Sequence, residues 1–181
     1  MFDSLFKTLI TKISWSIFIN RATGLENIPR NKGFIIAANH TSYMDIWILA
    51  VVFYLKEKNI VRFIAKKILT KDAHVKTLIR LFGPLTVPIY FDSNTSKEEL
   101  FEEATKTLKK GQIIGIFPEG ERNTAAEIRK GKTGMTRLAI ISKSPIVPIG
   151  INGTYEIMPK KKYPKIQKNR NIEYRKANLP Q

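Results

Sequence analysis

The 181-residue sequence contains no cysteine. This absence excludes a disulfide framework, a thiolate metal site and a cysteine nucleophile, and it suits a cytosolic compartment. Long apolar runs are also missing, since no segment approaches the roughly 18 to 20 uninterrupted apolar residues that a membrane-spanning helix needs. The first residues do not form a secretion signal, because Asp3 precedes Lys7 and no small-residue cleavage site follows the apolar stretch. We therefore expect a chain without a transmembrane span.

Acidic residues are scarce as well. Asp and Glu total 15 against 31 Lys and Arg, which gives a formal net charge of +16. A field of this sign attracts polyanions, and the two common ones are nucleic acid and anionic lipid headgroups. Composition alone does not choose between them. The length and the 43% hydrophobic content fit one folded domain with its own core.

The first 20 residues carry a clear helical pattern. Apolar residues recur there at helical spacing, which predicts a helix over residues 2–19 with one apolar side. These residues are Phe2, Leu5, Phe6, Leu9, Ile10, Ile13 and Ile17. Such a helix either packs on the core or lies in the headgroup plane of a membrane, and its aromatic content with flanking lysines also fits the second arrangement. We interpret residues 1–20 as an N-terminal amphipathic helix and residues 21–181 as a single domain.

Beyond residue 20, short apolar segments alternate with longer helical ones. The predicted strands are residues 33–38, 61–65, 86–90, 112–117 and 146–151. The predicted helices are residues 46–55, 66–82 and 93–110, followed by one that ends at residue 141. This alternation predicts an α/β fold with a largely parallel central sheet flanked by helices. The Lys- and Arg-rich tail, residues 160–176, is predicted to be a solvated and partly flexible end.

One of the two histidines follows the first predicted strand directly, in Asn39-His-Thr-Ser-Tyr-Met-Asp45. A neutral imidazole is a natural general base near pH 7, and a carboxylate on its other nitrogen fixes its tautomer and orientation. His40 and Asp45 can meet if His40 ends the strand and Asp45 lies in the first turn of the next helix. Thr41 or Ser42 would then cap that helix. Taken alone, the pair fits a structural histidine and a helix-start acid better than a catalytic pair.

A second polar cluster follows the fourth predicted strand. It reads Phe117-Pro-Glu-Gly-Glu-Arg122, in which Pro118 and Gly120 favour a tight loop. Glu119 is suited to accept hydrogen bonds from a hydroxylated substrate, and Arg122 is suited to bind a phosphate with two donors. Taken alone, this cluster is a charged turn.

In this order, the two clusters together resemble the motifs of the glycerolipid acyltransferases, a family that includes bacterial lysophosphatidic acid acyltransferase. Ala65-Lys-Lys-Ile-Leu69 resembles the lysine-bearing segment of that family, and Pro145-Ile-Val-Pro-Ile-Gly-Ile151 with Gly153 resembles its last strand. The resemblance covers roughly residues 20 to 155. Four blocks in the right order make chance a poor explanation.

The resemblance implies a catalytic dyad in which His40 is the general base and Asp45 holds the imidazole. His40 would deprotonate the free hydroxyl of the lysolipid, which would then attack the thioester of acyl-CoA or acyl-carrier protein directly. The residues implied in binding the acceptor are Lys66, Phe117, Pro118, Glu119, Gly120 and Arg122. Neither a cofactor beyond the acyl co-substrate nor a metal ion is expected. The implied product is phosphatidic acid, in phospholipid biosynthesis.

The resemblance also gives the basic charge and the N-terminal helix a role. The helix would bring the site to an anionic bilayer surface, so we expect a peripheral membrane protein on the cytoplasmic face. A nucleic-acid partner is not expected, because the aromatic residues cluster in the N-terminal helix and the apolar strands instead of interleaving with basic residues.

One position departs from the family pattern in a way that concerns the acceptor. Phe91 stands where the family has an arginine thought to contact phosphate. The acceptor is therefore either 1-acyl-glycerol-3-phosphate or a different lysolipid. A non-catalytic basic module that binds membranes or nucleic acid is the alternative outside the enzyme class.

Overall fold

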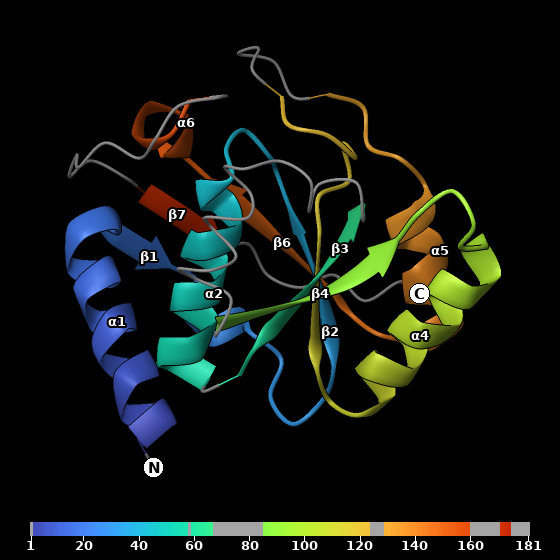
Figure 1. Cartoon of the computed structure of the whole chain (residues 1–181), viewed down its shortest axis with the longest axis horizontal. Helices are drawn as coiled ribbons and strands as arrows, with labels where there is room; N and C mark the ends of the chain where they lie inside the picture. Colours follow the sequence, from blue (N-terminus) through green and yellow to red (C-terminus); the bar gives the residue numbers. More distant parts are fainter. Residues whose placement is uncertain (1, 58, 67–84, 124–128, 160–170, 175–181) are drawn as a thin grey trace.

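The structure is a computed structural model of the chain and describes residues 2–57, 59–66, 85–123, 129–159 and 171–174 (Figure 1). The helices in these ranges are α1 (Phe2–Phe18), α2 (Met44–Glu57), α4 (Lys97–Lys109), α5 (Gly134–Ser142) and α6 (Thr154–Ile157), with a short 3-10 helix at Leu25–Asn27. The strands are β1 (Arg21–Thr23), β2 (Phe34–Ala38), β3 (Val61–Lys66), β4 (Thr86–Phe91), β5 (Ile113–Ile116), β6 (Ile146–Ile151) and β7 (Asn171–Tyr174). None of the described helices has the length and apolarity to cross a membrane.

The strands form one sheet in the order β1-β7-β6-β2-β5-β3-β4. The five strands from β6 to β4 pair in parallel, whereas β7 runs antiparallel to β6 and parallel to β1. This arrangement confirms the predicted α/β fold with a largely parallel sheet. Because parallel strands end at the same edge, the loops that follow the neighbours β2 and β5 emerge side by side. Those two loops carry the two polar clusters of the sequence.

Helices cover both faces of the sheet. α1 and α2 lie on one face, and α4 and α5 lie on the other (Figure 1). The division is visible within β2, where Phe34, Ile36 and Ala38 join the core cluster that contains α2, while Ile35 joins the cluster of α4 and α5. Successive residues of a strand point to opposite faces, so the continuous apolar run of β2 fits a strand buried on both sides.

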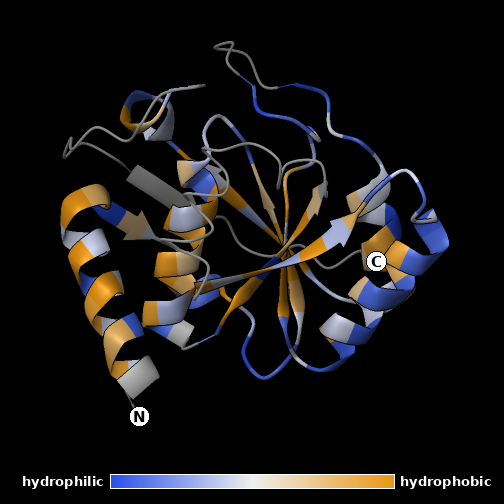
Figure 2. Cartoon of the chain, viewed as in Figure 1, coloured by the Kyte–Doolittle hydropathy of each residue, from blue (hydrophilic) through white to orange (hydrophobic). Residues whose placement is uncertain are grey.

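The helix predicted over residues 2–19 is confirmed as α1, which packs against α2. Thr11 and Ser14 are buried, and their hydroxyls donate to carbonyl oxygens within the helix itself. Large apolar side chains of α1 are instead exposed, and the orange colour along much of this helix in Figure 2 marks its hydrophobic residues. The exposed fractions are 72% for Leu5, 57% for Phe6, 59% for Leu9 and 50% for Ile13. An apolar stripe of this kind is left uncovered by the described part of the chain.

Most other predicted elements lie where the sequence places them. α4 begins directly after Ser96, whose side chain accepts from the Glu99 backbone while the Glu99 carboxylate accepts from the Ser96 backbone. α2 extends the predicted helix by two residues at each end. The predicted basic helix over residues 66–82 falls outside the described residues, except for Lys66, which ends β3.

The prediction of a solvated, partly flexible tail over residues 160–176 is wrong for its described part. Residues 171–174 form β7, which pairs with both β1 and β6. The N–H and C=O groups of a strand hydrogen-bond to its neighbours in the sheet, whatever the charge of the residues around it. β1 and α6 were not predicted either, because three or four residues are too few to show a period.

Candidate active site

The two polar loops meet at the carboxyl ends of β2 and β5. β2 ends at Ala38, and α2 begins at Met44, so that His40 lies in the connection and Asp45 in the first turn of the helix. Nδ1 of His40 lies 2.8 Å from Oδ2 of Asp45. The structure thus brings this pair together along the strand, cap and helix path that the sequence suggested. His40 is 8% exposed and Asp45 is fully buried.

The Asp45 carboxylate is surrounded by hydrogen-bond donors. Oδ2 accepts from the backbone N–H of Thr41 at 2.7 Å and of Ser42 at 2.9 Å, and Oδ1 accepts from the hydroxyl of Thr154. Because the carboxylate serves these groups as an acceptor, its contact with His40 requires the proton on Nδ1. This tautomer leaves the lone pair of Nε2 free to take a proton from another molecule.

Ser42 caps the start of α2. It is one of the two residues that the sequence offered as the cap. Its hydroxyl accepts from the backbone N–H of Met44 at 3.1 Å, and its carbonyl accepts from the backbone N–H of Asp45 at 3.1 Å. The same hydroxyl donates to the carbonyl of Met158 at 2.8 Å. The cap therefore ties the first turn of α2 to the end of α6.

An aromatic stack supports the imidazole from the side of β5. The rings of His40 and Phe117 lie 3.9 Å apart between centroids with an interplanar angle of 14°. Phe63 of β3 continues the stack, with its ring centroid 5.8 Å from that of Phe117 and an angle of 9°. Phe117 is thus placed against the histidine ring, which limits the orientations that the imidazole can adopt.

Glu119 lies next to the histidine backbone and is 7% exposed. Its Oε1 accepts from the backbone N–H of His40 at 2.9 Å. Its Oε2 is buried and has no hydrogen-bond partner among the described residues. The backbone N–H of Asn123 donates to the carbonyl of His40 at 2.7 Å. One oxygen of Glu119 is therefore bonded to the His40 backbone, and the other has no hydrogen bond to a described residue.

The remaining residues of this loop shape it. Gly120 has a φ of 76°, in the left-handed region, and its N–H donates to the Phe117 carbonyl at 3.0 Å. The Pro118 carbonyl accepts from the backbone N–H of Lys132 at 2.7 Å. The Arg122 guanidinium lies 3.6 Å from the ring centroid of Tyr43. Stacking on an aromatic ring orients a guanidinium while leaving its N–H edges for an anion.

Two further positions named in the sequence analysis, Lys66 and Phe91, lie at the ends of β3 and β4. Lys66 pairs with Phe91 at the last position of this strand pair. The side chain of Lys66 lies outside what the structure describes. Phe91, the residue that replaces the expected arginine, is therefore at the same edge of the sheet as the two polar loops.

Sequence reasoning missed two residues that shape the site. Asn39 adjoins the histidine, and its side-chain amide exchanges two hydrogen bonds with the backbone of Ile151, at 2.8 and 2.7 Å, which joins β2 to β6. Its position next to His40 in the sequence was the only signal that could have indicated this role. Thr154 lies 109 residues from Asp45, and nothing in its local sequence indicates the contact.

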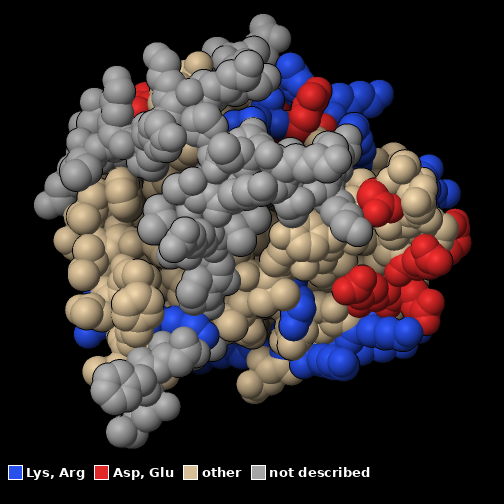
Figure 3. All heavy atoms as spheres, in the orientation of Figure 1, with Lys and Arg blue, Asp and Glu red and all other residues tan. Residues whose placement is uncertain are grey.

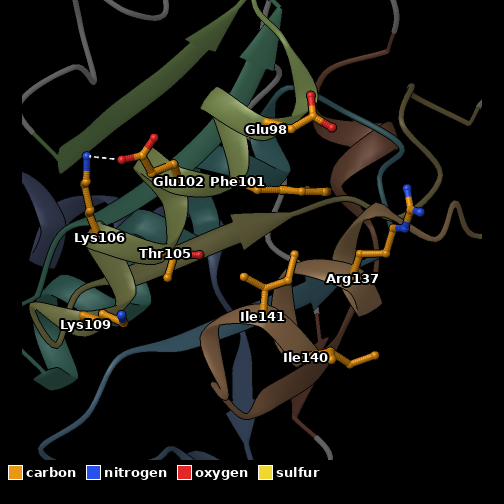
Figure 4. A pocket seen from close by; sticks show the side chains of 9 residues that line it. All are labelled: Glu98, Phe101, Glu102, Thr105, Lys106, Lys109, Arg137, Ile140 and Ile141. Atoms are coloured by element: carbon orange, nitrogen blue, oxygen red, sulfur yellow. Dashed lines mark ion pairs between the residues drawn. The ribbon is translucent and has the colours of Figure 1, made fainter.

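A separate hollow of about 720 Å³ lies between α4 and α5, on the other face of the sheet (Figure 4). Phe101, Ile140 and Ile141 provide its apolar part, and the ion pair between Lys106 and Glu102 lies at its rim. It shares no residue with the dyad or the two loops. Across the described residues, no three His, Asp or Glu side chains are grouped to hold a metal ion.

Comparison with known proteins finds similarity to acyltransferases. A family model described as Acyltransferase matches residues 20–152. The 1-acyl-sn-glycerol-3-phosphate acyltransferase of Borreliella burgdorferi is 30% identical over 136 residues, which are 73% of this chain and 50% of that protein. The protein of the same name from Bacillus subtilis is 29% identical over 128 residues, which are 71% of this chain and 60% of that protein. The chain thus spans between half and three fifths of the length of these relatives.

The likeness extends to a solved structure. The crystal structure of the 1-acyl-sn-glycerophosphate acyltransferase PlsC from Thermotoga maritima superposes with a TM-score of 0.69 at 26% sequence identity. The match covers 98% of this chain and 69% of that one.

Proposed function

The chain belongs to the acyltransferase family, and we propose that it transfers a fatty acyl group from an acyl thioester to the free hydroxyl of a lysolipid. The observation that carries this proposal is the buried pair of His40 and Asp45, held at the carboxyl ends of two parallel strands. The pair has the parts that a general base needs: a free imidazole nitrogen and a carboxylate that fixes the other one.

In the proposed reaction, Nε2 of His40 takes the proton of the acceptor hydroxyl as its oxygen attacks the carbonyl carbon of the thioester. The carbon–sulfur bond then breaks, and the proton on His40 passes to the leaving thiolate. Asp45 holds the imidazole in place and stabilises the imidazolium that exists between these two transfers. No covalent acyl-enzyme is needed, in keeping with a chain that contains no cysteine.

We propose 1-acyl-glycerol-3-phosphate as the acceptor and phosphatidic acid as the product. The names of the relatives support this choice. Arg122, oriented by Tyr43, offers donors to the phosphate, and the buried Oε2 of Glu119 offers an acceptor to a glycerol hydroxyl. Phe91 supplies no charge where a second phosphate ligand is expected. A different lysolipid is therefore the competing acceptor.

The acceptor and the product are membrane lipids, so the enzyme must work at a bilayer. The four outward apolar side chains of α1 suit insertion into the interface between headgroups and acyl chains. We propose that α1 docks the protein on the cytoplasmic face, where acyl-CoA or acyl-carrier protein supplies the acyl group. No other cofactor is required by this reaction.

The test is a substrate panel for the purified full chain in mixed micelles, with the products identified by mass spectrometry. Lysophosphatidic acid and lysolipids with other headgroups are each offered with acyl-CoA and with acyl-carrier protein. We expect phosphatidic acid to form fastest. Turnover restricted to another lysolipid would move the acceptor and keep the reaction. A folded protein that acylates none of these acceptors would refute the proposed function.

A further inference from the structure

We infer that Thr154 is a positioning residue for acyl transfer, acting on His40 through Asp45; this inference rests on the function proposed above. Thr154 is the first residue of α6 and is 1% exposed. Its hydroxyl donates to Oδ1 of Asp45, the carboxylate oxygen that does not contact His40. Within the described residues, Thr154 is the only side chain other than His40 that hydrogen-bonds to this carboxylate.

The direction of each hydrogen bond follows from counting protons. Thr154 has a single hydroxyl proton, and the carboxylate of Asp45 can only accept it. The hydroxyl of Thr41, 3.1 Å from that of Thr154, must therefore be the donor in their contact. The result is an ordered chain of donors from Thr41 to Thr154 to Asp45, while His40 donates to the opposite carboxylate oxygen.

The short helix that carries Thr154 is fastened at both ends to the start of α2. Thr154 holds the first end, and the Ser42 hydroxyl, bonded to the Met158 carbonyl at 2.8 Å, holds the second. Gly153 enters the helix with a φ of 80°, which favours glycine at this turn from β6. α6 is thus fixed against the first turn of α2, and its position sets the orientation of Asp45.

Without the Thr154 hydroxyl, Oδ1 of Asp45 would be a buried acceptor without its side-chain donor. The carboxylate would then replace the lost hydrogen bond in one of two ways. It would rotate toward the remaining donors, the backbone N–H groups of Thr41 and Ser42, or it would accept from a water molecule that enters the site. Either change moves Oδ2 relative to Nδ1 of His40 and releases the imidazole from one orientation. The loss falls on the chemical step and not on the binding of substrate, because the hydrogen bonds of the Thr154 side chain to described residues go to Thr41 and Asp45 and not to Glu119 or Arg122, which are proposed to hold the acceptor.

The test compares Thr154→Val and Thr154→Ala, which both remove the hydroxyl, with Thr154→Ser, which keeps it. Thr107→Val is the matched control, because Thr107 is a buried threonine whose hydroxyl donates within α4 to the Glu103 carbonyl. For the Val and Ala variants we expect kcat to fall roughly 10- to 100-fold, with KM changed by no more than about twofold. Thr154→Ser should retain most of kcat, and Thr107→Val should match the wild type.

Proton NMR of the histidine ring nitrogens gives a readout that depends neither on turnover nor on the thermal midpoint of unfolding. The chain has two histidines, so the Nδ1–H resonance of His40 is assigned by its loss in His40→Ala. We expect this resonance to be observed downfield in the wild type and Thr154→Ser, and to shift or broaden by exchange with water in Thr154→Val and Thr154→Ala.

Wild-type resonances and kcat in the Val and Ala variants would overturn the inference. Equal losses in Thr154→Ser and Thr154→Val would do the same, because the hydroxyl would then not be the group that matters. A wild type without any acyl transfer would refute the proposed function alone, since the NMR comparison would still report whether Thr154 holds the dyad.

Discussion

Asp45 organises more of the site than its one contact with His40 suggests. Three donors besides the imidazole converge on its buried carboxylate, two from the backbone of the preceding turn and one from α6. A buried carboxylate is costly unless such donors compensate for the lost water. The arrangement therefore supports the local fold and the orientation of the imidazole with the same set of hydrogen bonds.

Asp45→Asn should partly separate the support of the local fold from the orientation of the imidazole. An amide retains the shape, but it cannot accept from all four donors, and it no longer stabilises an imidazolium. We expect kcat to fall by about 10²- to 10⁴-fold, the range associated with a general base and its orienting carboxylate. The measurement is kcat and KM on the substrate that the panel identifies, together with the thermal midpoint. A folded Asp45→Asn with kcat near that of the wild type would contradict the assigned role.

The sequence predicted His40 and Asp45 because their partnership is local. Five residues separate them, and the path between them, a strand followed by a capped helix, is short enough to be inferred from the local pattern. Thr154 could not be found in this way, since its contact depends on how β6 and α6 pack against β2 and α2. Glu119 was predicted to be a substrate ligand, which stays a prediction, while its bond to the His40 backbone depends on the pairing of β2 with β5.

β5 influences the dyad through the aromatic stack. Gly115 lies in β5 beside Phe63 of β3, and a methyl group at this position would come within 2.4 Å of the Phe63 ring. Phe63 stacks on Phe117, which in turn stacks on His40. A strand position that never touches the histidine thus controls the packing behind it.

Gly115→Ala should therefore lower both stability and kcat. Overpacking of this kind costs about 1–3 kcal/mol, and the displaced ring shifts the support of the imidazole. Ser96→Ala is the control, because it loses the α4 cap at a cost of about 1 kcal/mol without touching the stack. Chemical denaturation and kcat are measured for both. An equal reduction of kcat in both variants, or no reduction in either, would contradict the proposed link through the rings.

α1 supplies the surface that we expect to enter the bilayer interface. Leu5→Gln with Leu9→Gln removes two of its outward apolar side chains, and we expect vesicle partitioning to fall at least about 10-fold. The double variant Ile140→Gln with Ile141→Gln is the control, because those residues are 62% and 57% exposed on α5, across the sheet. Co-sedimentation with lipid vesicles measures both. Equal losses in the two variants would show that exposed apolar area, and not α1, governs binding.

The predictions for individual elements succeeded where a segment was long enough to show its period. α2, α4 and the five parallel strands have continuous apolar runs, periodic faces or caps that identify them. β7 lacks these signals, since four residues between Lys- and Arg-rich neighbours carry only a fragment of a pattern. The outward orientation of α1 was likewise undetermined, because an apolar stripe is equally compatible with a core and with a membrane.

Charged side chains are unevenly distributed over the face of the molecule seen in Figure 3. In the view of Figure 3, acidic and basic side chains gather on the side of α4, whereas the side of α1 is largely uncharged. With a net charge of +16, we expect the protein to be attracted to an anionic bilayer at long range and the apolar face of α1 to act at contact. The two contributions respond differently to salt.

Raising the ionic strength from about 0.01 M to about 1 M shortens the Debye length from about 30 Å to about 3 Å. We therefore expect binding to phosphatidylglycerol vesicles to weaken strongly with salt, and the weaker binding to phosphatidylcholine vesicles to change little. Co-sedimentation at a series of salt concentrations measures this difference. Salt-independent binding to the anionic vesicles would show that the basic charge has no part in membrane attachment.

The most direct test of the proposed enzyme is the rate of acyl transfer by the wild type and by His40→Ala, measured side by side on the best donor and acceptor. His40 is the one residue that every step of the proposed reaction uses. We predict a fall in kcat of about 10²- to 10⁴-fold, the contribution of a positioned general base, in a variant that still binds vesicles. A folded His40→Ala with a rate within about twofold of the wild type, far from the loss expected for a general base, would contradict the account.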